Sequence, residues 1–333
     1  MYSSSVPIFE IDLHADPRFR LRETVSCSDN LHVADMLADQ AEAAYSHLSA
    51  FAKAAIEAVA VAIRPFGGRR YRHEIGAWAK ALDRTPGSMT LLNYTYEMSY
   101  AENMSVLPFG CTAGVKWVPG MGMVHVRNLD WPLYWVGPAT NIMEYKNGKH
   151  PYTTVGVAGL VGALSGMVPG AYSVTVNHAP AVGRINFKTG PLFLLRQVLE
   201  TCDTYDKAVH KLSCTKLAVP VFFTVCGAAR GQACVIERTQ SDAAIREFDK
   251  VPLVQSNDFT SDKFSGIGAE DYGTEDSRVR SLALAGALAD VGHKGLKEIA
   301  SCLDIEPVLN IETQQQMAFC PATGEMQVWR RDS

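Results

Sequence analysis

A cysteine followed at a distance by a basic and an acidic residue is the group in this sequence best suited to chemistry. Cys111 follows Gly110, and Arg127 and Asp130 come later in the stretch His-Val-Arg-Asn-Leu-Asp. A thiol attacks a carbonyl carbon well only as the thiolate, so it needs a base nearby. An N-terminal residue carries its own base, because a free α-amino group titrates at about 7.7–8.0. We therefore interpret the Gly110–Cys111 bond as a cleavage site that exposes Cys111 as an N-terminal nucleophile.

Arg127 and Asp130 would complete this site. Asp130 can hold and orient the new amino group, whereas Arg127 can lower the local pKa and bind a substrate carbonyl or polar head. Both follow a strand-like stretch, 123–126, so a hairpin would return them to Cys111. Two other interpretations stay open at this point, namely a buried structural cysteine and an ion pair that flanks a surface turn.

The segments around this site resemble one family of enzymes. Phe-Gly-Cys-Thr at 109–112 and Arg-Asn-Leu-Asp at 127–130 are similar to the acid ceramidase and N-acylethanolamine acid amidase family of N-terminal nucleophile (Ntn) cysteine hydrolases. That family is related more distantly to penicillin V acylase and bile salt hydrolase. The resemblance extends in the same order to the segments 7–20, 91–97, 173–177, 255–258 and 275–278.

The resemblance implies further site residues. The side-chain amide of Asn257 and the backbone N–H of Asn177 would bind the oxyanion, where one donor contributes about 2.7–4 kcal/mol. Arg278, at the start of a helix, would contact substrate or form a structural ion pair. Asn177 is followed here by His178, where the family has a glutamate. This departure puts an acidic pH optimum in doubt, and His178 is either a group that titrates near pH 6.5 or a loop residue.

Apolar side chains are concentrated in the loop that follows Asp130. We expect Trp131, Tyr134 and Trp135, together with His178, to contact substrate, although a core role is open for most of them. Ligand pockets are mostly apolar with a few placed polar groups. This composition favours an acyl chain over a peptide.

The resemblance implies an amidase that hydrolyses the C–N bond of lipid-like N-acyl amides, of N-acylethanolamine or ceramide type, through a cysteine thioester. It implies no metal and no organic cofactor, and the two fragments of the cleaved chain would stay associated. The alternative within enzymes is a penicillin V acylase-like, bile salt hydrolase-like or acyltransferase activity on smaller acyl amides. The alternative from another class is an uncleaved, non-catalytic lipid-binding protein.

Composition narrows the class of protein. The 333 residues are 47% hydrophobic and 20% charged, as in soluble globular proteins. The formal charge of −4 and the lack of a long basic run exclude a typical nucleic-acid binder. Eight cysteines without a C-x-x-C pair argue against a zinc or thioredoxin-type site. Residues 1–7 lack the features of a secretory signal, which favours an intracellular enzyme, or a lysosome-like compartment if a signal has been removed.

The pattern of elements changes at the proposed cleavage site. Residues 1–110 read as a mainly helical region after a first strand at 6–15, and residues 111–333 as the Ntn-hydrolase region. Helices are expected at 30–66, 74–82, 88–100, 191–202, 205–212, 278–291 and 294–302. Strands are expected at 115–118, 123–127, 152–157, 171–176, 219–225, 233–238, 243–248, 316–320 and 326–330. The family implies an α+β fold, a four-layer α-β-β-α sandwich.

Two apolar stretches invite a membrane interpretation. Residues 54–63 form either a core helix or a partly exposed apolar face that touches membrane. Residues 150–183 lack acidic residues, lysine and arginine, but their glycines and a proline favour two buried strands joined by a glycine-rich turn over a transmembrane helix.

Overall fold

Two β-sheets, one antiparallel with six strands and one mixed with eight, form the centre of the molecule. The computed structural model describes residues 2–64, 67–100, 110–180, 184–267, 274–292 and 294–332. The six-stranded sheet has the order β1 (Tyr2–Ser3), β14 (Glu325–Arg331), β13 (Thr313–Cys320), β4 (Gly122–Asp130), β3 (Gly110–Val118) and β12 (Leu253–Gln255). The eight-stranded sheet has the order β11 (Ala243–Glu247), β10 (Ala233–Arg238), β9 (Val221–Gly227), β8 (Tyr172–Asn177), β7 (Ser165–Val168), β6 (Tyr152–Val157), β5 (Thr140–Lys146) and β2 (Ile8–Asp12). Neighbouring strands are antiparallel except β2 and β5, which are parallel.

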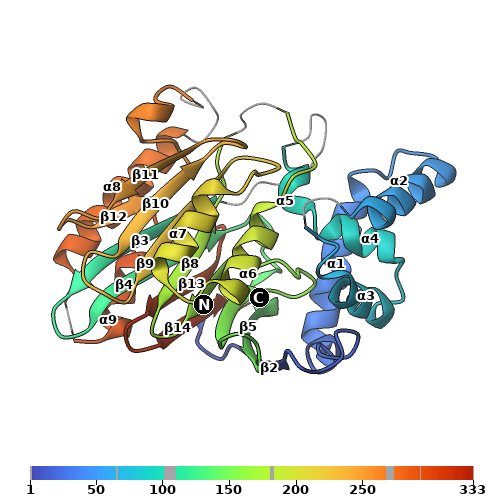
Figure 1. Cartoon of the computed structure of the whole chain (residues 1–333), viewed down its shortest axis with the longest axis horizontal. Coiled ribbons are helices and arrows are strands. Elements are labelled where there is room, and N and C mark those ends of the chain that lie inside the picture. Colours follow the sequence, from blue (N-terminus) through green and yellow to red (C-terminus); the bar gives the residue numbers. More distant parts are fainter. Residues whose placement is uncertain are drawn as a thin grey trace.

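Helices cover the outer face of each sheet, which confirms the predicted α+β fold (Figure 1). On the six-stranded sheet, α8 (Thr274–Asp290) packs against β3 and β12, and α9 (Leu296–Ala300) against β13. On the eight-stranded sheet, α6 (Pro191–Thr201) packs against β7 and β8, and α7 (Tyr205–Cys214) against β9 and β10. The inner faces meet where β3 and β4 contact β8 and β9. The described elements therefore follow the order helix, sheet, sheet, helix.

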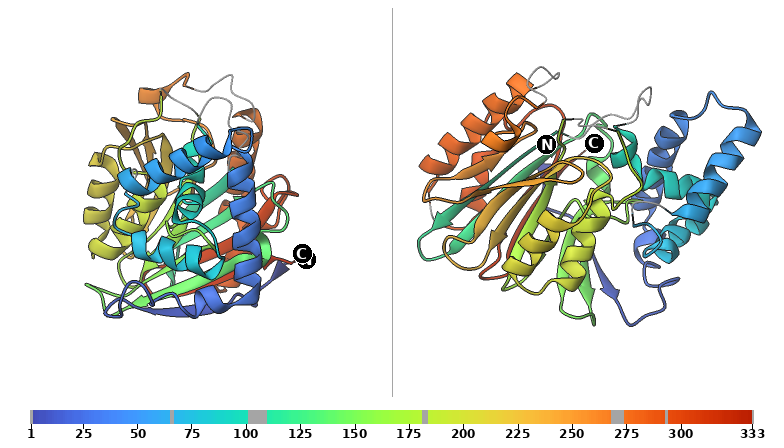
Figure 2. Two further views of the ribbon diagram at one scale, coloured as in Figure 1. Left: turned by 90° about the vertical axis from the view of Figure 1, so that its right-hand side faces the viewer. Right: turned by 45° about the horizontal axis from the view of Figure 1, so that its top comes forward.

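The N-terminal region adds a group of helices at one end of the molecule (Figure 2). These are α1 (Ser28–Ala43), α2 (Ala50–Ile63), α3 (Arg72–Ala81), α4 (Pro86–Leu92) and α5 (Thr95–Met98). The expected helix at 30–66 is two helices, since the chain leaves the helix after residue 43 and Ser49 caps a new one by accepting a hydrogen bond from the backbone N–H of Ala52. The expected helix at 88–100 is likewise divided between α4 and α5. Residues 65–66, the end of the helix expected at 30–66, lie outside the described residues.

Short 3₁₀ helices link several of these elements, at Thr24–Ser26, Gly137–Ala139, Asp262–Phe264 and Ser301–Leu303. The stretch 150–183 contributes the strands β6, β7 and β8 as far as it is described. Buried strands are thus confirmed, but there are three where two were expected. Within the described ranges, none of the helices combines the length and the apolar character needed to cross a bilayer.

Strands β1, β5, β7 and β12 were not expected from the sequence. Strand β7 has four residues and β12 three, which is too short for an alternating pattern to be read. The short β12 matters for the site, because its last residue, Gln255, pairs with Ala113 of β3. This pairing places the segment after β12 beside the start of β3.

Candidate active site

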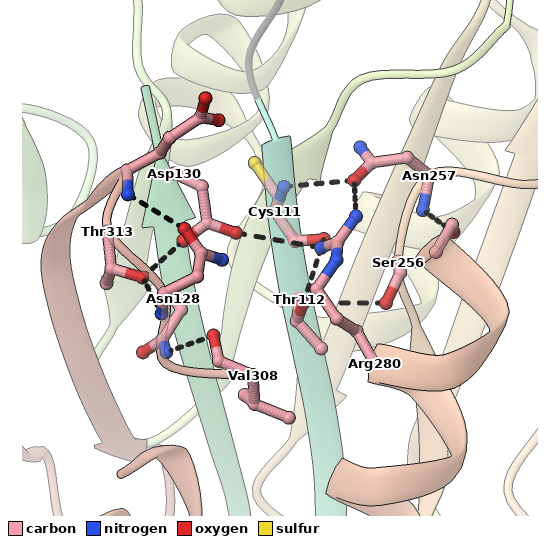
Figure 3. A network of polar contacts seen from close by, with 12 residues as sticks. Cys111, Thr112, Asn128, Asp130, Ser256, Asn257, Arg280, Val308 and Thr313 are labelled. Atoms are coloured by element: carbon pink, nitrogen blue, oxygen red, sulfur yellow. Dashed lines mark hydrogen bonds and ion pairs between the residues drawn. The ribbon is translucent and has the colours of Figure 1, made fainter. Parts of the chain in front are cut away.

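Cys111 is the second residue of β3, and the β3–β4 hairpin returns the chain to it. Gly110 is opposite Asp130 and Ala113 is opposite Arg127 in the antiparallel register. Because successive side chains point to opposite faces of a sheet, Cys111 and Arg127 face the other sheet, whereas Asp130 faces α8. The hairpin thus brings both predicted partners to the cysteine (Figure 3 shows Asp130).

Arg127 contacts the thiol directly. Its Nη2 donates to Cys111 Sγ at 3.0 Å and to the carbonyl of Val176 at 2.7 Å, and its Nη1 donates to Ser165 Oγ at 2.7 Å. Both Cys111 and Arg127 are fully buried. Burial raises the pKa of the Cys111 thiol, and the guanidinium opposes this rise. Arg127 therefore offsets part of the cost of forming a thiolate at this buried position.

Asp130 lies beside Gly110, the residue before Cys111. A Cβ placed on Gly110 would be 3.0 Å from the Cβ of Asp130, so a larger residue would crowd the carboxylate. The Oδ1 of Asp130 accepts a hydrogen bond from Thr313 Oγ1 at 2.7 Å, and Oδ2 lies 3.6 Å from Nη1 of Arg280. Burial raises the pKa of Asp130, and the nearby Arg280 opposes the rise. The buried Oδ2 accepts no hydrogen bond from the described residues.

The acceptor that faces the nitrogen of Cys111 is Asn257. Its Oδ1 accepts from the backbone N–H of Cys111 at 3.0 Å and from Nη2 of Arg280 at 2.9 Å (Figure 3). Its Nδ2 donates to the carbonyl of His178 at 2.8 Å. In this geometry Asn257, rather than Asp130, is placed to hold an α-amino group on Cys111. The predicted oxyanion role of Asn257 would require Nδ2 to leave His178.

Arg280 is a site residue that sequence reasoning missed. It donates from Nη1 to the carbonyl of Cys111 at 2.9 Å and to Thr112 Oγ1 at 2.7 Å. The predicted residue, Arg278, points elsewhere: its side chain is 59% exposed and lies 3.6 Å from Asp258. Two residues along a helix correspond to a rotation of about 200°, so only one of the two arginines can face the sheet. Leu284 and Leu288 follow residue 280 at intervals of four residues and are buried against the sheet. This leucine repeat could have indicated from the sequence that Arg280 lies on the face of α8 that contacts the sheet.

Asn177 holds the segment that carries Asn257. Its Nδ2 donates to the carbonyls of Gln255 at 2.9 Å and Ser256 at 3.1 Å. From the other side, Ser277 Oγ accepts from the backbone N–H of Asn257 at 2.7 Å. The side chain of Asn177 is therefore a support for this segment, and any oxyanion role would fall to its backbone N–H, as predicted.

A buried carboxylate fixes the far end of the same segment. Glu237, on β10, accepts hydrogen bonds from the backbone N–H and the hydroxyl of both Thr260 and Ser261, at 2.7–3.2 Å. It also pairs with Arg246 of β11 at 2.8 Å, and Arg246 in turn donates to the carbonyl of Val254 and to Gln255 Oε1. We call Glu237 and Arg246 the loop clamp. It holds residues 254–261, and so Asn257, against the eight-stranded sheet.

The predicted substrate-binding residues do not all lie together. Trp131 is buried with Leu133 against α1, α4 and α5, where the two line a small gap beside Leu37 and Thr95. Tyr134 is exposed and lies 5.8 Å below the guanidinium of Arg331, and Trp135 packs partly buried at the core edge. Their contact with substrate stays a prediction.

His178 joins an aromatic cluster. Its ring stacks on Tyr100 at 4.7 Å and lies 5.5 Å from Tyr96, and its Nε2 is 3.2 Å from Ser99 Oγ. Burial lowers the pKa of His178 to about 4. The histidine is therefore neutral at pH 6.5, and its position assigns it to packing rather than to titration in that range.

No group of metal-binding side chains occurs among the residues that the structure describes. The site instead consists of a thiol, two guanidinium groups, a carboxylate and an amide, all supplied by β3, β4, α8 and the segment after β12. Such a set can stabilise a thiolate, hold an amine and bind a developing oxyanion.

Comparisons with known proteins found similar sequences among amide hydrolases. No family model matches the chain. The chain is 30% identical over 147 residues to the acid ceramidase of Heterocephalus glaber, a match that covers 36% of this chain and 37% of that protein. It is 28% identical over 169 residues to the N-acylethanolamine-hydrolyzing acid amidase of Caenorhabditis elegans, covering 47% of this chain and 48% of that protein. The matched part thus spans between a third and a half of these curated relatives.

The fold is also found in a solved structure. The N-acylethanolamine-hydrolyzing acid amidase ortholog of Caenorhabditis elegans superposes with a TM-score of 0.56 and 23% identity, covering 67% of this chain and 100% of that one. The resemblance drawn from the sequence is confirmed: this chain is a relative of acid ceramidase and N-acylethanolamine-hydrolyzing acid amidase and shares the fold of the latter.

Proposed function

We propose that this chain is a self-cleaving cysteine amidase that hydrolyses lipid-like N-acyl amides. The observation that carries the proposal is the convergence of three groups on one residue. The sulfur of Cys111 receives a hydrogen bond from Arg127, its nitrogen donates to Asn257, and its carbonyl receives one from Arg280. The names of the relatives supply the substrate class, namely N-acylethanolamines and ceramides.

The first step is cleavage of the chain. The thiolate of Cys111 attacks the carbonyl carbon of Gly110, the C–N bond breaks, and the Cys111 nitrogen takes a proton and becomes an amine. Water then hydrolyses the resulting thioester, which releases a carboxylate on Gly110 and regenerates the thiol. Arg127 stabilises the thiolate, and Asp130 lies beside the bond that breaks.

The second activity uses the new amine. The amine takes the thiol proton, the thiolate attacks the acyl carbonyl of the substrate, and the amine returns a proton to the leaving nitrogen. Water then attacks the thioester and releases the fatty acid. Asn257 Oδ1, held by Arg280, orients the amine, while the backbone N–H of Asn177 and the Nδ2 of Asn257 would bind the oxyanion.

A lipid substrate requires access to a membrane or micelle, and α2 offers an apolar surface for it. Phe51 and Val59 are 85% and 54% exposed, and Ile56 is exposed as well. Helix α2 lies at the edge of the helical group, away from both sheets (Figure 1). We include in the proposal that this face contacts lipid. Replacing Phe51 and Val59 by serine should reduce co-sedimentation with phosphatidylcholine vesicles, and unchanged sedimentation would refute this contact.

Electrophoresis under denaturing conditions tests the proposal most simply. We expect two fragments from the wild-type chain, which stay together in gel filtration, and a single inactive chain from Cys111→Ala. A wild-type chain that stays whole, even after incubation in mild acid, would support a non-catalytic lipid-binding protein. Comparing hydrolysis of a palmitoyl amide with a phenoxyacetyl amide separates a lipid amidase from an acylase or acyltransferase that uses smaller acyl groups.

A further inference from the structure

A cavity whose walls contain none of the residues around Cys111 carries an excess of positive charge. It has a volume of about 580 Å³ and lies where the loop after β2, the start of α3, the β5–β6 turn and the end of α6 meet. Its charged walls are Arg20, Arg70, Arg72, Lys149, Glu74 and Glu200. Four cationic side chains from three separate segments line one cavity in a protein whose formal charge is −4.

The two carboxylates of this cavity are already neutralised from behind. Arg196, which is fully buried, donates to both oxygens of Glu74 at 2.6 and 3.0 Å and lies 3.3 Å from Glu200. Its guanidinium is held between the rings of Tyr71 and Tyr145, at 4.5 and 4.7 Å from their centres. Glu74 and Glu200 therefore cannot compensate the other arginines in full.

Arg20 shows the resulting shortage of acceptors most clearly. Its side chain is only 13% exposed, yet its contacts are long, at 3.4 Å to Glu74 and 3.5 Å to the carbonyl of Ala15. Its buried Nε donates to no acceptor among the described residues. A buried guanidinium of this kind is costly unless its charge and its N–H groups find partners. An anion in the cavity would supply them.

The remaining cations leave room for such an anion. Arg70 pairs with Glu200 at 2.8 Å, and Lys149 lies 3.7 Å from Asp203 and donates to the carbonyl of Thr201 at 2.9 Å, so both of these cations already have partners. Arg72 is exposed at the first turn of α3 and its side chain bonds only to the carbonyl of Arg69 in the described structure. An arginine fork binds phosphate oxygens in pairs, and this geometry suits a doubly charged group better than a single carboxylate.

We propose that this cavity binds a phosphate monoester, with Arg20 and Arg72 as its principal contacts. The volume exceeds that of a phosphate group, so part of the attached alcohol would be enclosed as well. The phosphate comes either from a small soluble ester or from the headgroup of an acidic lipid. Cys111 is not part of this site, so binding of a phosphate monoester here does not depend on the proposed amidase function.

Calorimetric titration of the full-length chain tests the proposal. Glycerol phosphate represents the soluble source, and vesicles of phosphatidylcholine with phosphatidic acid represent the lipid source. We expect one of these to bind the wild-type chain, and Arg20→Gln and Arg72→Gln each to weaken that binding by about tenfold, the equivalent of one lost charge-assisted contact. The matched control is Arg22→Gln, an exposed arginine of the same loop that does not line the cavity, which should bind like the wild-type chain.

Binding of glycerol phosphate would assign the soluble ester. Binding of the mixed vesicles, without binding of glycerol phosphate, would assign the lipid headgroup if it exceeds the binding of vesicles of phosphatidylcholine alone. Because Arg72 is exposed, its replacement should leave the melting temperature within a few degrees of the wild-type value. The proposal would be overturned if neither probe binds, or if Arg72→Gln and Arg22→Gln bind the probe equally well.

Discussion

Replacing Glu237 by glutamine perturbs the candidate active site without touching it. The carboxylate is fully buried and accepts hydrogen bonds from both Thr260 and Ser261 as well as from Arg246. Glutamine keeps the volume, so the loss is that of the charge and of one acceptor. Asn257 lies three residues before Thr260, and its own position depends on the segment that the loop clamp holds.

The expected loss of stability in Glu237→Gln follows from the contacts that remain. Removing one member of a buried ion pair costs about 3–5 kcal/mol. Arg246 keeps 24% of its side chain in solvent, so we place the loss near the lower end, at about 3 kcal/mol. A shift of Asn257 by about 1 Å would slow a catalysed step by about a hundredfold, since the amine of Cys111 would lose its orientation.

Three measurements separate these effects. Urea unfolding gives the loss of stability, the rate of chain cleavage reports the first proposed step, and kcat for a palmitoyl amide reports the second. Glu247→Gln is the matched control, an exposed glutamate on the neighbouring strand β11, and should change stability by less than about 0.5 kcal/mol. If Glu237→Gln lowers stability as expected while the cleavage rate and kcat stay at the wild-type level, the loop clamp does not position Asn257 for either step.

Further expectations concern α8 and two buried titratable groups. Arg280→Gln should slow chain cleavage by at least about a hundredfold, whereas Arg278→Gln should leave it within about threefold, and the reverse order would return the catalytic role to Arg278. Burial raises the pKa of Glu97 from 4.5 to about 8, so the free energy of unfolding should fall as pH rises between these values; Glu97→Gln should flatten this fall in thermal melts, and an unchanged slope would contradict the assignment. His178→Asn should leave the midpoints of the pH–activity profile between pH 5 and 8 in place, because burial holds the pKa of this histidine at about 4; a displaced midpoint would show that it titrates there.

The pattern of the sequence was sufficient to bring Cys111 together with Arg127 and Asp130. Cys111, Arg127 and Asp130 lie on one hairpin, and a hairpin requires only strand-like stretches joined by a glycine-rich turn. Local sequence patterns predict contacts of this kind, because the residues that meet are close in the chain.

The partners that come from distant segments could not be placed in the same way. The choice between Arg278 and Arg280 depends on the rotation of α8 about its axis, which is set by how Leu284 and Leu288 pack against the sheet. Glu237 sits in a strand that otherwise reads as core, and nothing local shows that Thr260 and Ser261 will fold over it. The pKa of His178 depends on burial by Tyr96 and Tyr100, about eighty residues earlier.

The identity of the first residue of the larger fragment tests the central claim most directly. Edman sequencing, or intact-mass measurement of the purified protein, should find that this fragment begins with Cys111 and that its partner ends with Gly110. A larger fragment that begins at any other residue would contradict the account, since the thiol and the amine that accepts its proton would then belong to different residues.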